Sequence, residues 1–154
     1  ECVKTMDKIA KRIEPTINYW KRFDQNENID IKDLEDNIAY TVCVMAKSVK
    51  ADAIVCYTST GKSARRLSGM GAGCPIFAIT DNRRTFNQLA LAWNVFPVLI
   101  EGEEDINLVI EKGIEKHKVK GNLVSGDKVI LAGGSKILPA YATSKIFGGY
   151  LTID

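Results

Sequence analysis

The sequence predicts an α/β fold: a three-layer α/β/α sandwich around a five-stranded, mostly parallel sheet whose last strand is antiparallel. Short continuous apolar runs alternate with helix-patterned segments, as expected for buried parallel strands joined by helical crossovers. The last apolar segment follows a loop instead of a helix, which indicates an antiparallel edge strand. A length of 154 residues and a hydrophobic content of 45% lead us to expect a single domain over residues 1–154.

The chain opens directly in a helical rhythm. Apolar residues recur at spacings of three and four, at Val3, Met6, Ile9, Ala10 and Ile13. This helix should end before Pro15, because the residue preceding a proline is pushed out of helical geometry. The start lacks an initiator methionine and an N-cap, so we expect the chain to be cut from a longer protein. A polar stretch follows over residues 21–28.

The remaining elements follow from the change of periodicity along the chain. A second amphipathic helix is expected over residues 30–50, with acidic side chains near its positive end. Buried strands are expected over residues 53–57, 75–79, 95–100 and 128–132. The helices between them should cover residues 63–70, 83–94 and 103–118, and the last strand should lie within residues 144–153. Ligands of such a sheet collect at the carboxyl ends of its strands.

Composition narrows the function classes. The 21 basic and 19 acidic residues are spread along the chain, and a net charge of +2 provides no sustained field for nucleic acid. No apolar stretch approaches the roughly 20 residues that cross a bilayer, so we expect no membrane insertion. The cysteines show no close pair, which favours reduced, buried thiols and a cytoplasmic location over disulfides or zinc ligands. They are Cys2, Cys43, Cys56 and Cys74.

The most informative segment directly follows the first predicted strand and opens the next helix. It consists of Thr58, Ser59, Thr60, Gly61, Lys62 and Ser63. The N–H groups at a helix N-terminus point toward a bound phosphate, and Gly61 lets the backbone approach it closely. The hydroxyls and the Lys62 ammonium add donors, so the segment predicts a phosphate ester site. The alternative is that these hydroxyls only cap the helix.

Other chemistry is poorly supported. A nucleotide-triphosphate P-loop needs a glycine where this chain has Cys56, so that interpretation is disfavoured. His117, the only histidine, lies among lysines near a helix end and is interpreted as a solvated residue, not as a general base. Trp93 and Phe96 are interpreted as core aromatics. No catalytic residue and no metal site are expected.

Two neighbouring features could complete the phosphate site. Arg65 and Arg66 follow the hydroxyl-rich segment and either reach the anion or lie in solvent. A second glycine-rich stretch ends the fourth predicted strand at the same edge of the sheet. We expect it to close the other side of the pocket through Gly134, Ser135 and Lys136.

Several segments, in order and at the right spacing, resemble the C-terminal alpha/beta domain of pyruvate kinase. They are ECVKTM at residues 1–6, the strand and loop of residues 53–64, CPIFAIT at 74–80, QL at 88–89 and WNVFP at 93–97. The loop resembles the effector-phosphate loop of that family, with Thr60 where the family usually has serine. The resemblance covers essentially the whole chain and implies the fold described above.

The resemblance also implies what this chain lacks. Pyruvate kinases transfer phosphate from phosphoenolpyruvate to ADP with Mg and K ions, in a barrel domain that would precede residue 1. Cofactors and catalytic residues are therefore expected only in that absent domain. The resemblance implies a regulatory and assembly domain in a homotetrameric enzyme, with the rest of pyruvate kinase and a sugar phosphate effector as its partners.

Two departures from the family pattern bear on the effector. Gly102 and Val109 stand where bisphosphate-responsive relatives can carry a tryptophan and an arginine that hold a second phosphate. Loss of a charge-assisted arginine contact costs on the order of 2 kcal/mol. Residues 134–143 also lack the family's usual glycine spacing. We therefore expect a single-phosphate effector.

The rival hypothesis is a stand-alone small α/β protein that binds a phosphate ligand or is a phosphate-handling enzyme. The missing initiator methionine argues against it. An enzyme of that kind also needs a base or a metal positioned beside the hydroxyl-rich loop, and the sequence offers no plausible base there.

Overall fold

The computed structural model describes residues 1–26, 29, 31–133 and 150–152. Helices α1 (Cys2–Ile13), α2 (Tyr19–Asp24) and α3 (Leu34–Val49) come first, with a short 3₁₀ helix, η1 (Glu14–Thr16), after α1. The strands of the sheet are β1 (Ala53–Tyr57), β2 (Ile76–Thr80), β3 (Val95–Leu99), β4 (Lys128–Gly133) and β5 (Tyr150–Thr152). Helices α4 (Lys62–Met70), α5 (Arg83–Leu89) and α6 (Ile106–Val119) connect the first four strands.

The sheet has the predicted topology. Its strand order is β3-β2-β1-β4-β5, so the first strand lies at the centre. Strands β1 to β4 are parallel, and β5 pairs with β4 in the antiparallel direction. Ile54 lies between Ile76 of β2 and Ile130 of β4. This arrangement confirms the mostly parallel sheet with an antiparallel last strand.

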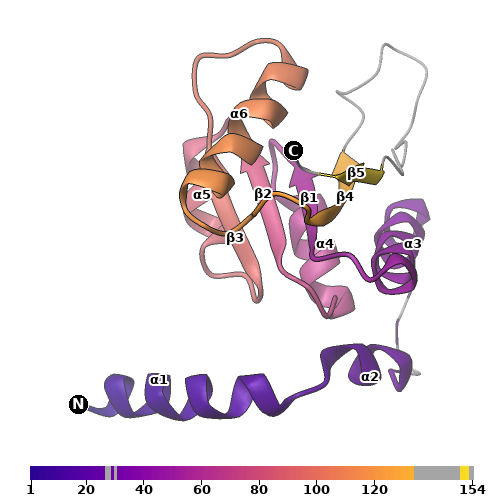
Figure 1. Cartoon of the computed structure of the whole chain (residues 1–154), viewed down its shortest axis with the longest axis vertical. Coiled ribbons are helices and arrows are strands. Elements are labelled where there is room, and N and C mark those ends of the chain that lie inside the picture. Colours follow the sequence, from indigo (N-terminus) through magenta and orange to yellow (C-terminus); the bar gives the residue numbers. More distant parts are fainter. Residues whose placement is uncertain (27–28, 30, 134–149, 153–154) are drawn as a thin grey trace.

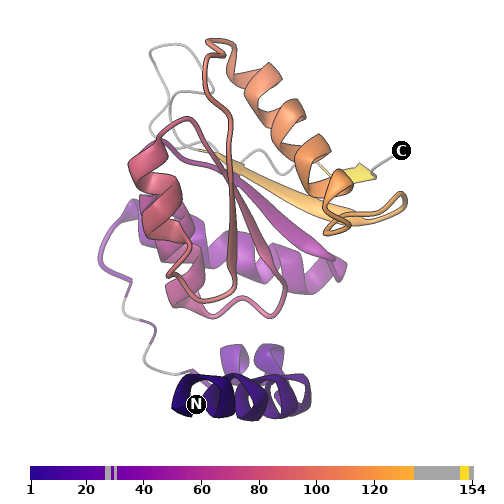
Figure 2. The same cartoon turned by 90° about the vertical axis from the view of Figure 1, so that its left-hand side faces the viewer.

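Helices cover both faces of the sheet, as Figures 1 and 2 show. Successive residues of a strand point to opposite faces. Ile54 and Cys56 accordingly belong to a core with α3 and α4, whereas Val55 and Tyr57 belong to a core with α6. The three-layer α/β/α sandwich is therefore confirmed. Strands β1 and β2 are buried on both sides, whereas β3 is only partly buried.

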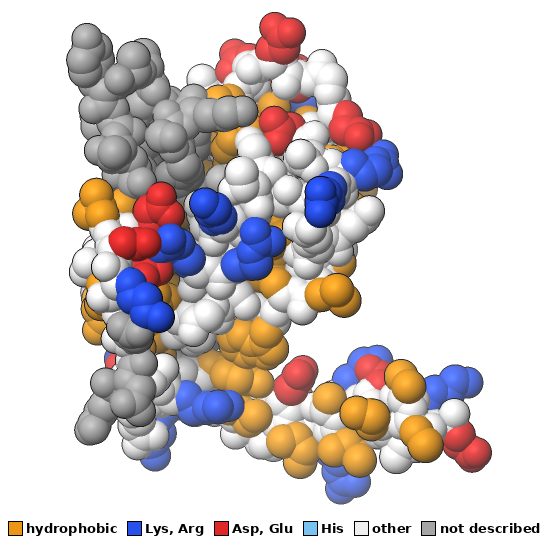
Figure 3. All heavy atoms as spheres, turned by 180° about the vertical axis from the view of Figure 1, so that it is seen from behind, with side chains coloured by type: hydrophobic (Ala, Val, Ile, Leu, Met, Phe, Trp, Pro, Cys, Tyr) orange, Lys and Arg blue, Asp and Glu red, His pale blue; other side chains and the backbone are white. Residues whose placement is uncertain are grey.

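Helix α1 lies outside this sandwich (Figure 1). It ends at Ile13, and Pro15 falls in η1, as the proline rule predicts. None of its residues is buried, and its apolar face is open to solvent. Figure 3 shows hydrophobic side chains along this outlying helix. The exposed residues of that face are Val3, Met6, Ile9 and Ile13.

Helix α2 was not predicted, because residues 21–28 read as a polar stretch. Its N-cap is Asn18, whose side chain accepts a hydrogen bond from the Lys21 N–H at 2.9 Å. Packing secures this six-residue helix: a Cβ on Gly73 would lie only 2.5 Å from the Trp20 ring. Phe23 stacks on Tyr40 of α3 with ring centroids 5.5 Å apart. Tertiary contacts thus support a helix too short to show a periodic pattern.

Three helix boundaries differ from the prediction by three residues or more, and one of them is the start of α6, at Ile106 instead of residue 103. Helix α3 begins later than residue 30, because Asp33 acts as the N-cap and accepts a hydrogen bond from the Asp36 N–H at 2.8 Å. Helix α5 ends at Leu89 instead of residue 94. Asn94 has a left-handed backbone with φ of 57° and donates from its side chain to the Cys74 carbonyl at 2.8 Å. That contact ties the start of β3 to the loop before β2.

The interpretation of Trp93 and Phe96 as core aromatics is wrong. Their exposed fractions are 40% and 46%. β3 is an edge strand, so its side chains have a neighbouring strand on only one side. Phe96 contacts Phe77 edge-on at 5.8 Å, and Trp93 contacts Tyr19 of α2 at 4.9 Å between ring centroids. Both rings therefore sit at the border of the core.

Candidate functional site

The hydroxyl-rich segment forms the turn between β1 and α4, as predicted. Thr58 Oγ1 accepts a hydrogen bond from the Gly61 N–H at 2.9 Å, which closes the turn. Gly61 has φ of 77° and is the N-cap of α4. A Cβ at this position would lie 2.9 Å from Arg65 Nη1 and 3.1 Å from Thr85 Cγ2. The left-handed backbone conformation therefore favours glycine, and the contact with Thr85 leaves little space for a side chain.

Side chains from neighbouring strands and helices hold this turn, and sequence reasoning missed them. Thr85 Oγ1, in α5, donates to the Ser59 carbonyl at 2.7 Å. The Tyr57 hydroxyl lies 3.1 Å from Ser59 Oγ and donates to Asp81 Oδ2 at 3.2 Å. Burial raises the pKa of Tyr57, so this hydroxyl keeps its proton. Thr85 and Asp81 follow β2, and Tyr57 is the last residue of β1, so no pattern within residues 58–63 marks them.

The start of α4 leaves donors for a ligand. No described residue accepts a hydrogen bond from the backbone N–H groups of Lys62, Ser63 or Ala64. These three groups lie in the first turn, at the positive end of a nine-residue helix. The Lys62 side chain is exposed and forms no ion pair with any described residue. Such an arrangement can bind an anion.

Arg65 turns back onto the loop. Its Nη2 donates to the Thr60 carbonyl at 2.8 Å, so the guanidinium braces the turn from outside. Of the two predicted alternatives, solvent describes Arg65: its side chain is exposed, and it also contacts the backbone of the loop.

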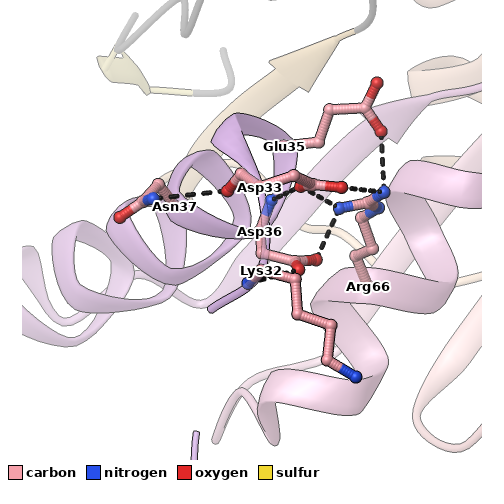
Figure 4. A network of polar contacts seen from close by, with 6 residues as sticks. All are labelled: Lys32, Asp33, Glu35, Asp36, Asn37 and Arg66. Carbon is pink, nitrogen blue, oxygen red and sulfur yellow. Dashed lines mark hydrogen bonds and ion pairs between the residues drawn. The ribbon is translucent and has the colours of Figure 1, made fainter. Parts of the chain in front are cut away.

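Arg66 faces the start of α3, where three carboxylates surround it (Figure 4). Its Nη2 donates to Asp33 Oδ2 at 2.9 Å and pairs with Glu35 Oε2 at 3.0 Å, and its Nη1 pairs with Asp36. The hydrogen bond from Arg66 lowers the pKa of Asp33 to about 2. Arg66 is therefore committed to joining α3 and α4, and neither predicted alternative, anion contact or free solvation, describes it.

The interpretation of His117 as a solvated residue is wrong. Its exposed fraction is 1%, and its ring stacks on Phe77 of β2 with centroids 4.4 Å apart. Nδ1 lies 3.2 Å from the amide nitrogen of Asn122, while Nε2 is buried without a hydrogen-bond partner among the described residues. Burial, with a smaller effect of Lys120, lowers the pKa of His117 to about 4. His117 is thus one of the residues by which α6 packs against the sheet.

Three of the cysteines are buried and unpaired, as predicted. They are Cys43, Cys56 and Cys74, and burial raises the pKa of each to about 12. A thiol with such a pKa is a poor nucleophile. Cys2 is exposed on α1. The part of the chain that the structure describes contains no group of three or more histidine, cysteine or acidic residues placed to hold a metal.

The second predicted side of the pocket, Gly134, Ser135 and Lys136, lies outside the described residues. Gly102 has φ of 77° and precedes α6. Val109 is buried in the core against the sheet, with an exposed fraction of 1%. It thus offers no polar group to a ligand. Among the described helices, none combines the length and apolar character that crossing a bilayer requires.

Comparison with known proteins gives the family. The family described as "Pyruvate kinase, alpha/beta domain" matches residues 36–145. Pyruvate kinase of Clostridium acetobutylicum is 31% identical over 134 residues, which cover 87% of this chain and 28% of that protein. The Thermotoga maritima enzyme is 30% identical over 134 residues, with the same two shares. The chain thus spans little more than a quarter of the length of these relatives.

Solved structures agree on the fold. A crystal structure of Cryptosporidium parvum pyruvate kinase has a TM-score of 0.76 at 22% identity, covering 86% of this chain and 28% of that one. A second structure of a pyruvate kinase from that organism has a TM-score of 0.78 at 23% identity, covering 89% and 28%. With the sheet topology, the matched family and these relatives in agreement, the chain belongs to the pyruvate kinase alpha/beta domain family.

Proposed function

We propose that this chain is the regulatory and assembly domain of a pyruvate kinase, and that residues 58–63 bind the phosphate of an allosteric effector. The observation that carries the proposal is the start of α4, where three backbone N–H groups have no described acceptor and the side chains of Lys62 and Ser63 are adjacent. Gly61 lets a ligand approach the backbone there. The site lies at the carboxyl end of the central strand, where open α/β sheets bind ligands.

The proposed role is not catalytic. A phosphotransferase needs a positioned base or an ion beside the transferred group. The Asp81 carboxylate beside the loop accepts a hydrogen bond from Tyr57 at Oδ2, and His117 is a buried residue of α6. Phosphate transfer from phosphoenolpyruvate to ADP, with its Mg and K ions, is assigned to the part of the enzyme outside these 154 residues.

The effector is proposed to be a sugar monophosphate. The start of α4 offers donors for one phosphate, whereas the buried Val109 side chain offers none for a second. Lys62 supplies the positive charge that a dianionic phosphate favours.

The assembly role is supported by α1. Its apolar residues Val3, Met6, Ile9 and Ile13 are between 51% and 77% exposed, a face that a further part of the enzyme would cover. Homo-oligomer formation in the parent enzyme and a cytoplasmic location belong to the same proposal; the unpaired, buried cysteines favour the latter.

Thermal unfolding of the 154-residue chain tests the ligand. Fructose 6-phosphate, glucose 6-phosphate and sulfate at millimolar concentrations should each raise the Tm; a ligand at a hundred times its Kd stabilises by about 2.7 kcal/mol. The double variant Lys62→Ala, Ser63→Ala should lose this protection. The matched control Lys8→Ala, Ser48→Ala alters two exposed residues of the same types elsewhere and should keep it.

An unchanged Tm across these ligands would overturn the phosphate site, as would equal protection of the Lys62→Ala, Ser63→Ala variant. The non-catalytic role has its own test. The chain, incubated with phosphoenolpyruvate, ADP, Mg²⁺ and K⁺, should form no pyruvate above the background of a protein-free mixture. Measurable turnover would contradict the proposal.

A further inference from the structure

A cavity of about 680 Å³ lies between α2 and the last turn of α4. The cavity is separate from the proposed phosphate site at residues 58–63. That site lies at the start of α4, and a nine-residue helix is roughly 13 Å long. The size of the cavity falls in the range of small-molecule sites. Three kinds of groups line it: aromatic rings, polar side chains of α2 and glycine backbone. Those used below are Tyr19, Trp93, Arg22, Gln25, Gly69 and Gly71.

One face of α2, together with its C-cap Gln25, supplies an aromatic ring, a guanidinium and an amide. Tyr19, Arg22 and Gln25 follow one another at a spacing of three, which brings side chains to the same side of a helix. Tyr19 leans against Trp93 at 4.9 Å between ring centroids, with 50° between the ring planes. Trp93 nevertheless remains 40% exposed. Tyr19 and Trp93 therefore form an aromatic wall of the cavity, and described residues cover the Trp93 ring only in part.

Arg22 supplies a positive charge beside this wall. No described carboxylate forms an ion pair with it, although neighbouring Asp24 pairs with Lys47 of α3. A guanidinium presents a flat fork of N–H donors that fits phosphate and carboxylate groups. The chemistry of the cavity thus combines a surface for a flat ring with a donor for an anion.

Gly69 and Gly71 line the cavity, and the reason for a glycine differs between the two positions. Gly71 has φ of 79° and ends α4 in a left-handed conformation, so the backbone explains it. Gly69 lies within α4, and a Cβ built there would meet no atom within 4 Å. Glycine within a helix costs roughly 1 kcal/mol relative to alanine. Neither conformation nor packing among the described residues explains Gly69, whereas a ligand that approaches the backbone would.

We propose that this cavity binds a small ligand with a flat aromatic ring and one anionic group. The ring lies against Trp93, the anion is held by Arg22, and Gly69 leaves the space that the ligand occupies. Gln25 supplies an amide donor and acceptor at the rim. A nucleoside monophosphate and an aromatic carboxylate share this chemistry. The proposal is independent of the phosphate loop.

Isothermal titration calorimetry of the 154-residue chain tests it. The probes are adenosine 5′-monophosphate and benzoate, measured in the Lys62→Ala, Ser63→Ala background so that the phosphate loop does not contribute. At least one probe should bind. Binding of the nucleotide alone identifies a phosphate ligand, and binding of benzoate alone a carboxylate. Adenosine, which lacks the anion, and ribose 5-phosphate, which lacks the ring, should bind at least tenfold more weakly than adenosine 5′-monophosphate when that probe binds.

Three variants locate the site. Arg22→Ala should weaken binding at least tenfold, while the control Arg12→Ala, at an exposed arginine of α1, should leave it unchanged. Gly69→Leu should abolish binding by filling the cavity but leave the Tm unchanged or higher, because leucine is the better helix former. Loss of binding without loss of stability separates occlusion from unfolding.

Several results would overturn the proposal. They are the absence of binding by both probes, wild-type affinity in Arg22→Ala or in Gly69→Leu, and equal binding of ribose 5-phosphate and the nucleotide. Disappearance of all binding in the Lys62→Ala, Ser63→Ala background would also overturn it and would assign the anion site to the loop. Failure here leaves the thermal-shift test of the loop unaffected.

Discussion

Gly113 of α6 lies so close to Ile79 of β2 that a Cβ on the glycine would be 2.5 Å from the Ile79 Cδ1 atom. Two further Ile79 side-chain atoms would lie within 2.7 Å of it. Ile79 is fully buried, so it has no room to move aside. The absence of a side chain at position 113 therefore sets how closely α6 covers its face of the sheet.

We expect Gly113→Ala to destabilise the chain. Alanine favours the helix by about 1 kcal/mol, but overpacking of a well-packed core costs roughly 1 to 3 kcal/mol. Urea unfolding should show a net loss of up to about 2 kcal/mol. Gly69→Ala in α4 is the matched control, because its Cβ meets open space, and it should stabilise by about 0.5 to 1 kcal/mol. A Gly113→Ala variant as stable as the wild type would contradict the close approach.

The Arg66 cluster predicts salt- and pH-dependent stability. Arg66→Ala should lower the Tm at low salt, and the difference should shrink in 1 M NaCl because exposed charges are screened. The pKa of Asp33 is lowered to about 2, so this contribution is present above its usual value of 3.8 and is lost as pH falls toward 2. Arg12→Ala, which removes an arginine with no described ion pair, should show neither effect. A salt-independent Tm difference would argue that Arg66 acts through packing alone.

His117 predicts a loss of stability in mild acid. Its pKa is about 4 in the folded chain and 6.5 in the unfolded chain, so the unfolded state binds more protons between these values. The free energy of unfolding should therefore fall as pH drops from 6.5 to 4, approaching a loss of roughly 3 kcal/mol. Other groups also titrate here, so the measurement is the difference between wild type and His117→Gln in urea unfolding at each pH. A difference that does not change with pH would refute the buried neutral imidazole.

The buried Val109 predicts weak discrimination between one phosphate and two. A second charge-assisted contact of about 2 kcal/mol would tighten binding roughly 30-fold. Without that contact, fructose 1,6-bisphosphate should bind within about fivefold of fructose 6-phosphate. Calorimetry on the 154-residue chain compares the two, with sulfate as the single-anion reference. A bisphosphate preference near 30-fold would reveal a second phosphate contact elsewhere.

Much of the fold follows from local pattern. The strand at residues 53–57 and its neighbours are continuous apolar runs, because both of their faces are buried. The hydroxyl-rich turn between β1 and α4 was equally predictable from the sequence, since residues 58–63 are contiguous and Thr58 and Gly61 close the turn within the segment. Properties that depend on consecutive residues can be predicted without a three-dimensional arrangement.

Contacts between distant residues could not be predicted this way. Arg66 is neither solvated nor on the ligand, because Asp33 and Asp36 approach it from a helix about thirty positions earlier in the chain. His117 has lysines beside it in sequence, yet Phe77 of a central strand covers its ring. Trp93 follows an apolar pattern, but it lies at the sheet edge against α2, where burial is incomplete.

The hydroxyl-rich turn combines local features, which the sequence predicts, with contacts from distant residues, which it does not. Sequence by itself determined the α/β/α sandwich, the glycine at the start of α4 and the donors of the loop, because periodicity and turn chemistry are local. Only the tertiary structure decided that Thr85 and Tyr57 contact Ser59 of the loop and that Val109 faces the core. It also decided that Arg66 forms ion pairs with carboxylates at the start of α3. Those assignments depend on which residues the sheet brings together, and the crossovers place them side by side from separate parts of the chain.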